Sequence, residues 1–218
     1  MSTTLVVEFE SIIRCFCVLS NIAWVASLDS LISYDTNLLV EGKRKEVYTL
    51  PRELEKSSGN LSIRAMISVE DVLWCGCEEG TIVLWSVESK HEIARFKAHS
   101  PHVVKHMLVV HTPRSETVWT VSPLERCIHV WATTAPYQKI ATVQTEHPIN
   151  CFAQHLRDFV WVGGNGEIHL YNSSTFELRG TWMAHNSSVN CVLSLGNRVW
   201  TGSAAGDLIV WEDYVRIR

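Results

Sequence analysis

Three histidines recur at one position of a repeated sequence pattern, and their side chains could take part in catalysis. His99, His147 and His185 each stand in a short segment between two apolar runs. A catalytic histidine acts as a general base only beside a nucleophile and an orienting carboxylate. Three copies of one residue do not make such a triad, so we expect each histidine to form a structural hydrogen bond within its own repeat.

Two pairs of cysteines have a C-x-C spacing, which places both thiols on one face of a strand. The pairs are Cys15 with Cys17 and Cys75 with Cys77. Structural zinc sites usually have two or more residues between paired ligands and need four ligands in total. We therefore interpret these residues as small core side chains and expect neither a metal nor a cofactor. The seven cysteines, an odd number without a small-domain framework, indicate reduced thiols in a cytoplasmic protein.

A third set of polar residues follows the first apolar residue of each repeated segment. Side chains alternate between the two faces of a strand. If the first apolar residue is buried against a neighbouring sheet, the residue after it points in the opposite direction. Three of the five are cationic, which suits a phosphate, an inositol headgroup or an acidic side chain of a partner. The alternative is a hydrated lining of polar groups. The five positions are Arg14, Arg64, Lys105, Asn150 and Asn190.

One segment between two repeats is longer and more charged than the others. Residues 51–60 contain Arg52, Glu53 and Lys56. Insertions in repeat proteins project from a rim, where partners dock. These three residues are therefore candidate partner-binding residues, with a merely solvated loop as the alternative.

The spacing of tryptophans identifies the elements that must position all of these side chains. Nine tryptophans occur in 218 residues, and five of them recur at intervals of 50, 45, 42 and 39 residues, close to the roughly 40–45 of a four-stranded propeller blade. A second aromatic follows each of the five after 10 to 12 residues. We predict that the tryptophans form the cores of the blades. The first set is Trp24, Trp74, Trp119, Trp161 and Trp200, and the second is Tyr34, Trp85, Trp131, Tyr171 and Trp211.

Turn residues between the two aromatics of a pair predict a β-hairpin in each repeat. The whole chain is therefore expected to be an all-β, single β-propeller of four-stranded antiparallel blades. The last repeat lacks a fourth strand, and residues 4–9 match that strand, so we expect the N-terminal strand to complete the C-terminal blade. A larger ring with further blades is the alternative. The predicted blades are residues 11–50, 61–97, 102–144, 148–183 and 187–218 plus 4–9.

Short motifs in these repeats resemble those of the WD-repeat family. The pairs Ala98-His99, Glu146-His147 and Ala184-His185 are similar to the family's Gly-His dipeptide, and the segments around Trp85, Trp131 and Trp211 resemble its Trp-Asp ending. The segment around Trp161 resembles divergent propellers of signalling proteins such as Rho exchange factors, Roco-type kinases and some inositol phosphatases. The resemblance covers about 200 residues.

The resemblance also implies a buried Asp–His–Ser–Trp tetrad that locks a blade. The last repeat supplies His185, Ser203 and Trp211, but Ala205 stands where the aspartate is expected. These blades should therefore depend more on apolar packing than on polar contacts.

Composition and motifs favour an interaction protein over an enzyme. The formal net charge of −4 argues against general binding to nucleic acid, and no uncharged run is long enough for a transmembrane segment. No nucleophile elbow, phosphate loop or metalloprotease motif occurs. We expect a non-catalytic scaffold in the cytoplasm that docks protein partners on the propeller faces and rim. The alternative is a propeller that recognises an anion, either a phosphoinositide headgroup or a phosphopeptide, at a basic channel mouth.

Overall fold

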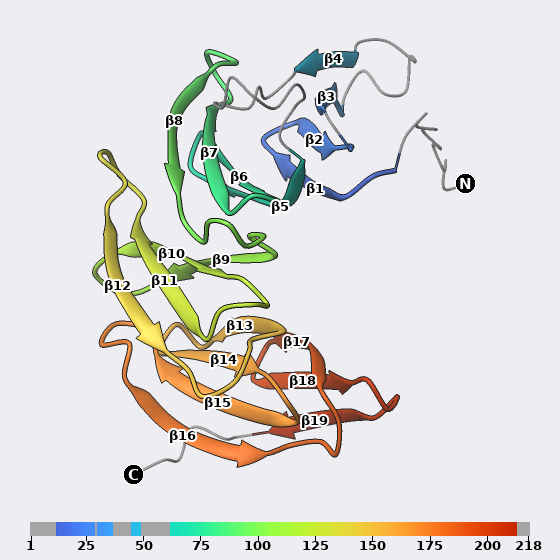
Figure 1. Cartoon of the computed structure of the whole chain (residues 1–218), viewed down its shortest axis with the longest axis vertical. Helices are drawn as coiled ribbons and strands as arrows, with labels where there is room; N and C mark the ends of the chain where they lie inside the picture. The colour runs from blue at the N-terminus through green and yellow to red at the C-terminus, as the bar shows by residue number, and fades with distance from the viewer. Residues whose placement is uncertain (1–11, 29, 37–44, 49–61, 213–218) are drawn as a thin grey trace. The chain divides into compact units, whose positions relative to one another are not determined.

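The computed structural model describes residues 12–28, 30–36, 45–48 and 62–212 of the chain (Figure 1). Within these ranges the chain forms nineteen β-strands and no helix. The strands make five antiparallel sheets, four with four strands and one with three. The all-β prediction, with one sheet for each tryptophan repeat, is confirmed.

The chain divides into two compact units between Lys105 and His106, and each unit is described by itself. The first unit holds two sheets, in which the strands follow one another in sequence order. The strands of its first sheet are β1 (Cys15–Leu19), β2 (Ile22–Ala26), β3 (Leu31–Asp35) and β4 (Lys45–Tyr48). Those of its second sheet are β5 (Ile63–Val69), β6 (Val72–Cys77), β7 (Thr81–Ser86) and β8 (Glu92–Lys97).

The second unit holds the other three sheets. Each is again a meander of strands that are neighbours in sequence. The strands are β9 (His106–His111), β10 (Glu116–Val121), β11 (Cys127–Ala132) and β12 (Lys139–Gln144); then β13 (Cys151–His155), β14 (Phe159–Gly163), β15 (Glu167–Asn172) and β16 (Leu178–Met183); and finally β17 (Val189–Leu195), β18 (Arg198–Ser203) and β19 (Leu208–Glu212).

The sequence predicts that the fourth strands begin at Val47, Glu92, Lys139 and Leu178. The strands β8, β12 and β16 do so, and β4 begins two residues earlier, at Lys45. The predicted starts of the first strands are Ile12, Ile63, Val103, Ile149 and Val189. The strands β5 and β17 begin there, whereas β1, β9 and β13 begin two or three residues later. The predicted closure of the last sheet by residues 4–9 lies outside the described residues. The proposed division into blades stays a prediction.

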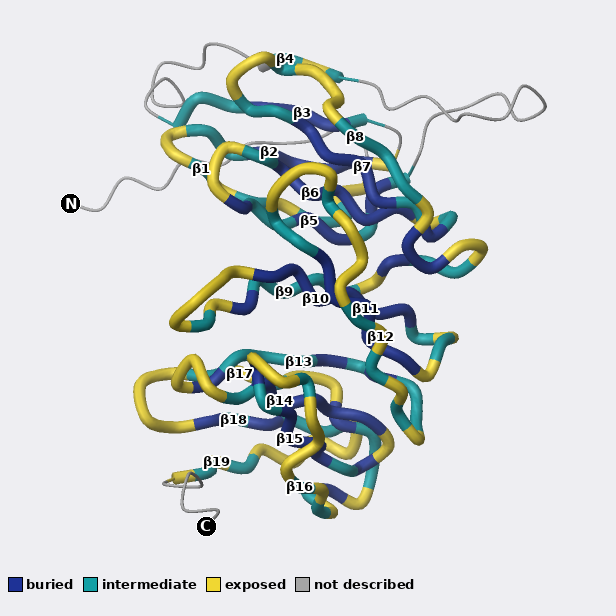
Figure 2. Tube along the Cα trace, turned by 90° about the vertical axis from the view of Figure 1, so that its left-hand side faces the viewer, coloured by how far each residue is buried: buried dark blue, intermediate teal, exposed yellow. Residues whose placement is uncertain are grey.

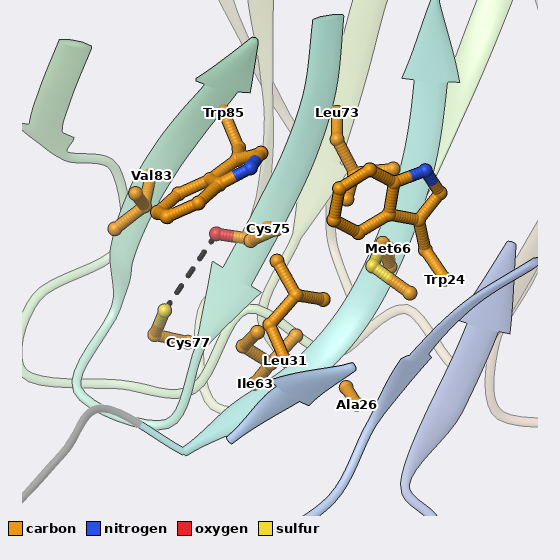
Figure 3. Packing of buried hydrophobic residues seen from close by; sticks show 10 residues of the cluster. All are labelled: Trp24, Ala26, Leu31, Ile63, Met66, Leu73, Cys75, Cys77, Val83 and Trp85. Carbon is orange, nitrogen blue, oxygen red and sulfur yellow. Dashed lines mark hydrogen bonds between the residues drawn. The ribbon is translucent and has the colours of Figure 1, made fainter. Parts of the chain in front are cut away.

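The second and third strands of the first four sheets are mostly buried, dark blue in Figure 2, whereas β19 of the last sheet has no buried residue. In the first unit, Trp24 of β2 packs with Leu73, Cys75 and Trp85 of the next sheet (Figure 3). In the second unit, the face that carries Trp119 packs on Val160, Val162 and Tyr171, and the face that carries Trp161 packs on Val189 and Val199. Within each unit, the tryptophan face of one sheet thus packs on the opposite face of the sheet that follows in sequence.

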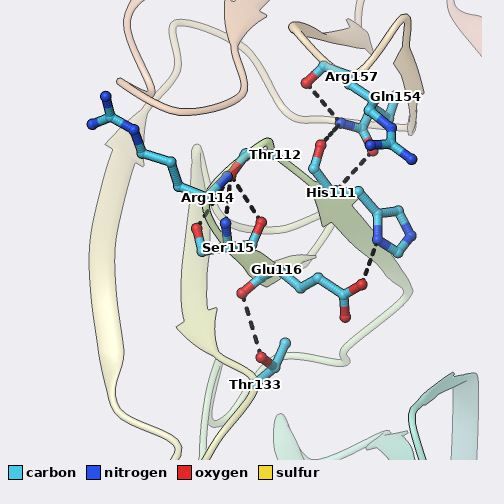
Figure 4. Close-up of polar contacts among 8 residues, drawn as sticks. All are labelled: His111, Thr112, Arg114, Ser115, Glu116, Thr133, Gln154 and Arg157. Carbon is cyan, nitrogen blue, oxygen red and sulfur yellow. Dashed lines mark hydrogen bonds and ion pairs between the residues drawn. The ribbon is translucent and has the colours of Figure 1, made fainter.

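A glutamine side chain also links two sheets of the second unit (Figure 4). The Gln154 amide donates to the backbone carbonyl of His111 at 2.6 Å and accepts the backbone N–H of His111 at 2.9 Å. It also donates to the carbonyl of Arg157 at 2.9 Å. The amide therefore pairs with β9 as a strand residue would, and it satisfies both backbone groups of His111.

Two hairpin glycines hold the segments that contain the Ala-His dipeptides. The carbonyl of Gly80 accepts the backbone N–H groups of Ala98 and His99 at 2.8 and 2.9 Å. The carbonyl of Gly166 accepts those of Ala184 and His185 at 2.9 and 3.0 Å. A Cβ atom at either glycine would lie within 2.6 Å of backbone atoms in these segments. The close approach explains why glycine occupies both turns.

We predict that Gly166→Ala destabilises the chain much more than Gly206→Ala. Both glycines have positive φ, 82° and 91°, so both substitutions strain the backbone by about 1 kcal/mol. At Gly166 the new methyl group would also lie 2.6 Å from the carbonyl oxygen of His185, whereas nothing lies within 4 Å at Gly206. Urea unfolding should show a further loss of about 2 kcal/mol or more for Gly166→Ala. Equal losses in both variants would contradict the close approach.

Candidate functional site

In four of the five sheets, the predicted polar residue lies at the start of the first strand, where two residues of that strand face one residue of the second. In β5 the pairing with β6 shifts between Ile63 and Ala65, so Arg64 has no partner across the ladder. In β17 the pairing with β18 shifts between Val189 and Cys191, which leaves Asn190 as the extra residue. A bulge bends the strand locally and redirects the side chain of the extra residue.

Arg14 and Asn150 occupy the same position in two other sheets. The backbone N–H of Arg14 donates to Ala26, which is already the ladder partner of Cys15, at 2.9 Å. The backbone N–H of Asn150 likewise donates at 2.9 Å to Gly163, the ladder partner of Cys151. Two residues therefore face one in all four sheets. The four sheets thus share one register at this position, whereas Lys105, the fifth residue of the predicted set, lies before the first residue of β9.

Three of the five residues surround one pocket in the first unit. The pocket has a volume of about 370 Å³. Arg14 and Arg64 come from two neighbouring sheets, and Lys105 comes from the segment before β9. The remaining lining residues are Ile13, Val103 and Glu78. The structure thus brings together the three cationic residues singled out in the sequence.

The pocket is electropositive and only partly neutralised. The guanidinium of Arg64 donates through Nη2 to the carboxylate of Glu78 at 2.6 Å. Three cations and one carboxylate leave a formal charge of +2. The Nε atoms of Arg14 and Arg64 are buried, and neither has a hydrogen-bond partner among the described residues. Buried N–H donors without partners are costly, so an acceptor that reaches these two side chains from the pocket would relieve that cost.

The other predicted partner-binding residues lie elsewhere. Asn150 belongs to the second unit, where its Nδ2 donates to the carbonyl of Gly164 at 3.3 Å, and Asn190 is exposed in the same unit. Arg52, Glu53 and Lys56 fall in a segment outside the described residues. Sequence reasoning missed Glu78 as a site residue, although it stands in the turn of the β6–β7 hairpin, directly after the strand that pairs with β5.

A hydroxyl group joins the histidine and tryptophan of the last sheet. The Thr201 hydroxyl accepts the indole N–H of Trp211 at 2.9 Å and forms a hydrogen bond of 2.8 Å with Nε2 of His185. The expectation that Ser203 takes this place is wrong, because the Ser203 side chain contacts the hairpin turn at Asp207 instead. The Nδ1 atom of His185 is buried without a partner among the described residues, as expected where Ala205 replaces an aspartate.

Comparisons with known proteins add to this geometry. No protein-family model matches the chain. Among curated proteins, a probable serine/threonine-protein kinase of Dictyostelium discoideum, pats1, is 20% identical over 173 residues, which make up 79% of this chain and 5% of the kinase. The chain therefore spans a small part of that relative.

Solved structures match over most of the chain. A chain of the mitotic checkpoint complex has a TM-score of 0.69 at 16% identity, over 91% of this chain and 60% of its own length. The β-propeller domain of Cps50 (Swd1) from Myceliophteria thermophila has a TM-score of 0.73 at 12% identity, over 94% of this chain and 72% of its own. The fold is a β-propeller. The computationally designed protein Ika8 is similar too, with a TM-score of 0.62 at 17% identity, over 94% of this chain and 72% of its own.

Not all of the propeller's predicted structural residues are equally buried. Trp24, Trp74, Trp119 and Trp161 are at most 2% exposed, and Trp85 and Trp131 are also buried. Trp200 and Trp211 are only partly buried. The face of Trp200 also carries apolar side chains that are 38–65% exposed: Leu193, Leu195, Leu208 and Val210.

The three repeated histidines do not share one structural role, contrary to expectation. His99 and His185 are buried, whereas the side chain of His147 is 42% exposed and its Nε2 lies 3.8 Å from Glu167. The same carboxylate lies 3.3 Å from His169, a buried histidine whose pKa is lowered by burial and raised in part by Glu167. His147 therefore belongs to a surface polar cluster rather than to the core of the propeller.

The C-x-C pairs lie in the core, as the sequence predicts. All four thiols are free and belong to or pack against the cluster around Trp24. Burial raises the pKa of Cys15 to about 11 and that of Cys77 to about 12, and burial also raises the pKa of Cys75. Such thiols stay protonated near neutral pH and are poor nucleophiles.

No helix with the length and hydropathy of a membrane span occurs in the described ranges.

We predict that Thr201→Val lowers the free energy of unfolding by about 1–3 kcal/mol, because the indole N–H of the partly buried Trp211 and Nε2 of the buried His185 lose their shared hydrogen-bond partner. Valine keeps the shape of the side chain, so the loss reports the hydrogen bonds rather than a cavity. Ser203→Ala is the control and should cost well under 1 kcal/mol. The measurement is urea unfolding followed by tryptophan fluorescence, and a larger loss in the control would contradict the assignment of Thr201.

Proposed function

We propose that this propeller is a non-catalytic scaffold that docks protein partners in the cytoplasm. The observation that carries the proposal is the β-propeller fold itself, which is similar to a chain of the mitotic checkpoint complex and to the Swd1 propeller domain. Fold alone does not define function, so the proposal also needs surfaces that fit partners. The pocket of Arg14, Arg64 and Lys105 supplies a polar surface, and the exposed side chains around Leu193 supply an apolar one.

We also propose that the repeats are of the WD type and belong to a signalling protein. Two features support this assignment. The Ala-His dipeptides at residues 98–99 and 184–185 bind the hairpin glycine of their own sheet through backbone N–H groups. The Thr201 hydroxyl also links His185 to Trp211, as the polar lock of the family would require. The distant likeness to the probable kinase pats1 supports a signalling role.

The chemistry of the site favours binding over catalysis. The pocket offers guanidinium and ammonium groups, which orient and neutralise an anion. Among the described residues of its lining there is no thiol, hydroxyl or imidazole, and the one carboxylate, that of Glu78, is paired with Arg64. A propeller that recognises an anion through this pocket is the second candidate function, and the unpartnered Nε atoms of Arg14 and Arg64 favour it.

Site-specific photo-crosslinking in the native cell tests the scaffold. We predict that a benzophenone amino acid at Lys105 or Leu193 crosslinks the chain to other proteins upon irradiation. The same group at Glu88 or Ser174, two exposed hairpin positions away from both surfaces, should not. Each crosslinked protein is then purified and tested for direct binding to the chain.

The scaffold proposal fails if no position crosslinks, or if the purified proteins do not bind the chain. It also fails if all four positions give the same products, because contact would then not be specific to the two surfaces.

A further inference from the structure

We propose that the pocket of Arg14, Arg64 and Lys105 binds a phosphorylated serine or threonine in a peptide segment of a protein partner. The inference rests on the proposed function, since it names the chemistry of one docking site on the scaffold. Arg14 precedes β1, Arg64 lies on the bulge of β5, and Lys105 ends the first unit, so all three belong to the same described unit.

The charge of the pocket favours a phosphate over a carboxylate. Three cations face one carboxylate, that of Glu78, which leaves a formal charge of +2. A phosphorylated side chain carries about −1.5 to −2 charges at neutral pH and would neutralise this excess, whereas a glutamate or aspartate would leave half of it. Arginine clusters are a recurrent means of recognising phosphorylated peptides.

The hydrogen-bonding state of the two arginines points to the same ligand. Guanidinium groups bind phosphate oxygens with pairs of parallel N–H donors. Arg64 uses one nitrogen, Nη2, on Glu78, while its Nε has no acceptor among the described residues. The Nε of Arg14 is equally without an acceptor there. A phosphate in the pocket supplies enough oxygens for both.

The apolar part of the lining favours a peptide over a free inositol phosphate. Ile13 is 45% exposed, and Ile13 and Val103 both border the pocket beside the cations. These side chains can pack on the methylene or methyl group of a phosphorylated residue and on its neighbours. An inositol ring presents hydroxyl or phosphate groups around its rim and gains nothing from apolar walls. The volume of about 370 Å³ also suits one side chain with its adjoining backbone.

Glu78 acts as an internal competitor for the ligand. Its carboxylate lies 2.6 Å from Nη2 of Arg64, and the side chain is 50% exposed. An incoming phosphate must displace this carboxylate or bind beside it, and repulsion between the two anions weakens binding. Removal of the Glu78 charge should therefore raise the affinity of the pocket for phosphate, an effect opposite to that of most substitutions at a binding site.

The experiment is an NMR titration of the full chain with defined peptides, observed through the arginine Nε–H resonances. The probe is the pentapeptide Ala-Ala-phosphoserine-Ala-Ala, with the unphosphorylated peptide, a glutamate analogue, inorganic phosphate and inositol hexakisphosphate as comparisons. We predict that the phosphopeptide moves the Arg14 and Arg64 signals with the highest affinity, and that the unphosphorylated peptide leaves them in place.

Two variants, each with a matched control, make the result specific. Arg64→Glu should weaken phosphopeptide binding at least tenfold, while Lys97→Glu, the same reversal at an exposed residue outside the pocket, should change it less than twofold. Glu78→Gln should strengthen binding about three- to tenfold, because one repulsive charge near the phosphate is removed. Glu88→Gln, at an exposed hairpin position, is its control. Unchanged spectra away from the substitution show that each variant is folded.

Several outcomes would overturn the proposal. They are the absence of any shift at Arg14 and Arg64, tighter binding of inositol hexakisphosphate or the glutamate peptide than of the phosphopeptide, and weaker binding in Glu78→Gln. The scaffold itself is judged separately, by repeating the crosslinking from Leu193 in the Arg64→Glu variant. If the Arg64→Glu variant still gives the crosslinked products and the titration fails, the scaffold proposal remains supported and only the phosphate site is rejected.

Discussion

The burial of an indole ring between facing sheets within each unit is the interaction on which this structure depends. Four of the repeat tryptophans are almost fully buried, and three of them, Trp24, Trp119 and Trp161, pack with aliphatic or thiol-bearing side chains of their own sheet or of a facing one. Burying a tryptophan is worth about 4–6 kcal/mol as an upper bound, comparable to the whole net stability of many domains. A single meander of four strands cannot bury both of its faces, so these rings keep the sheets, and every polar group on them, in place.

The apolar packing of the sheets positions the charged residues of the candidate pocket, which are not themselves part of the packed core. Ile63 is buried and anchors the start of β5, and the bulge that follows redirects Arg64 toward the pocket instead of into the sheet interface. Arg14 is held in the same way, by a backbone hydrogen bond to Ala26. Charged groups can therefore gather close to an apolar core without a charge being buried in that core, which would be costly.

Much of the fold was readable from the sequence, because periodic tryptophans, hairpin glycines and alternating strands are local signals. The common register of Arg14, Arg64, Asn150 and Asn190 was readable for the same reason. Side-chain contacts between paired strands could not be read from the sequence. For this reason Thr201 was missed and Ser203 was expected in its place, and the ion pair of Glu78 with Arg64 was not predicted. A signal for the threonine did exist: a hydroxyl residue directly follows the first tryptophan in two sheets, at Thr120 and Thr201, and both accept an indole N–H from the next strand.

The bulge at the start of the first strand has a consequence for how such repeats diverge. Its extra residue has no ladder partner, so one polar side chain can replace another there without disturbing strand register or the neighbouring core. The chain already shows this tolerance, with arginine at residues 14 and 64 and asparagine at residues 150 and 190. Ligand preference can thus evolve one sheet at a time through single codon changes, while the architecture is inherited unaltered.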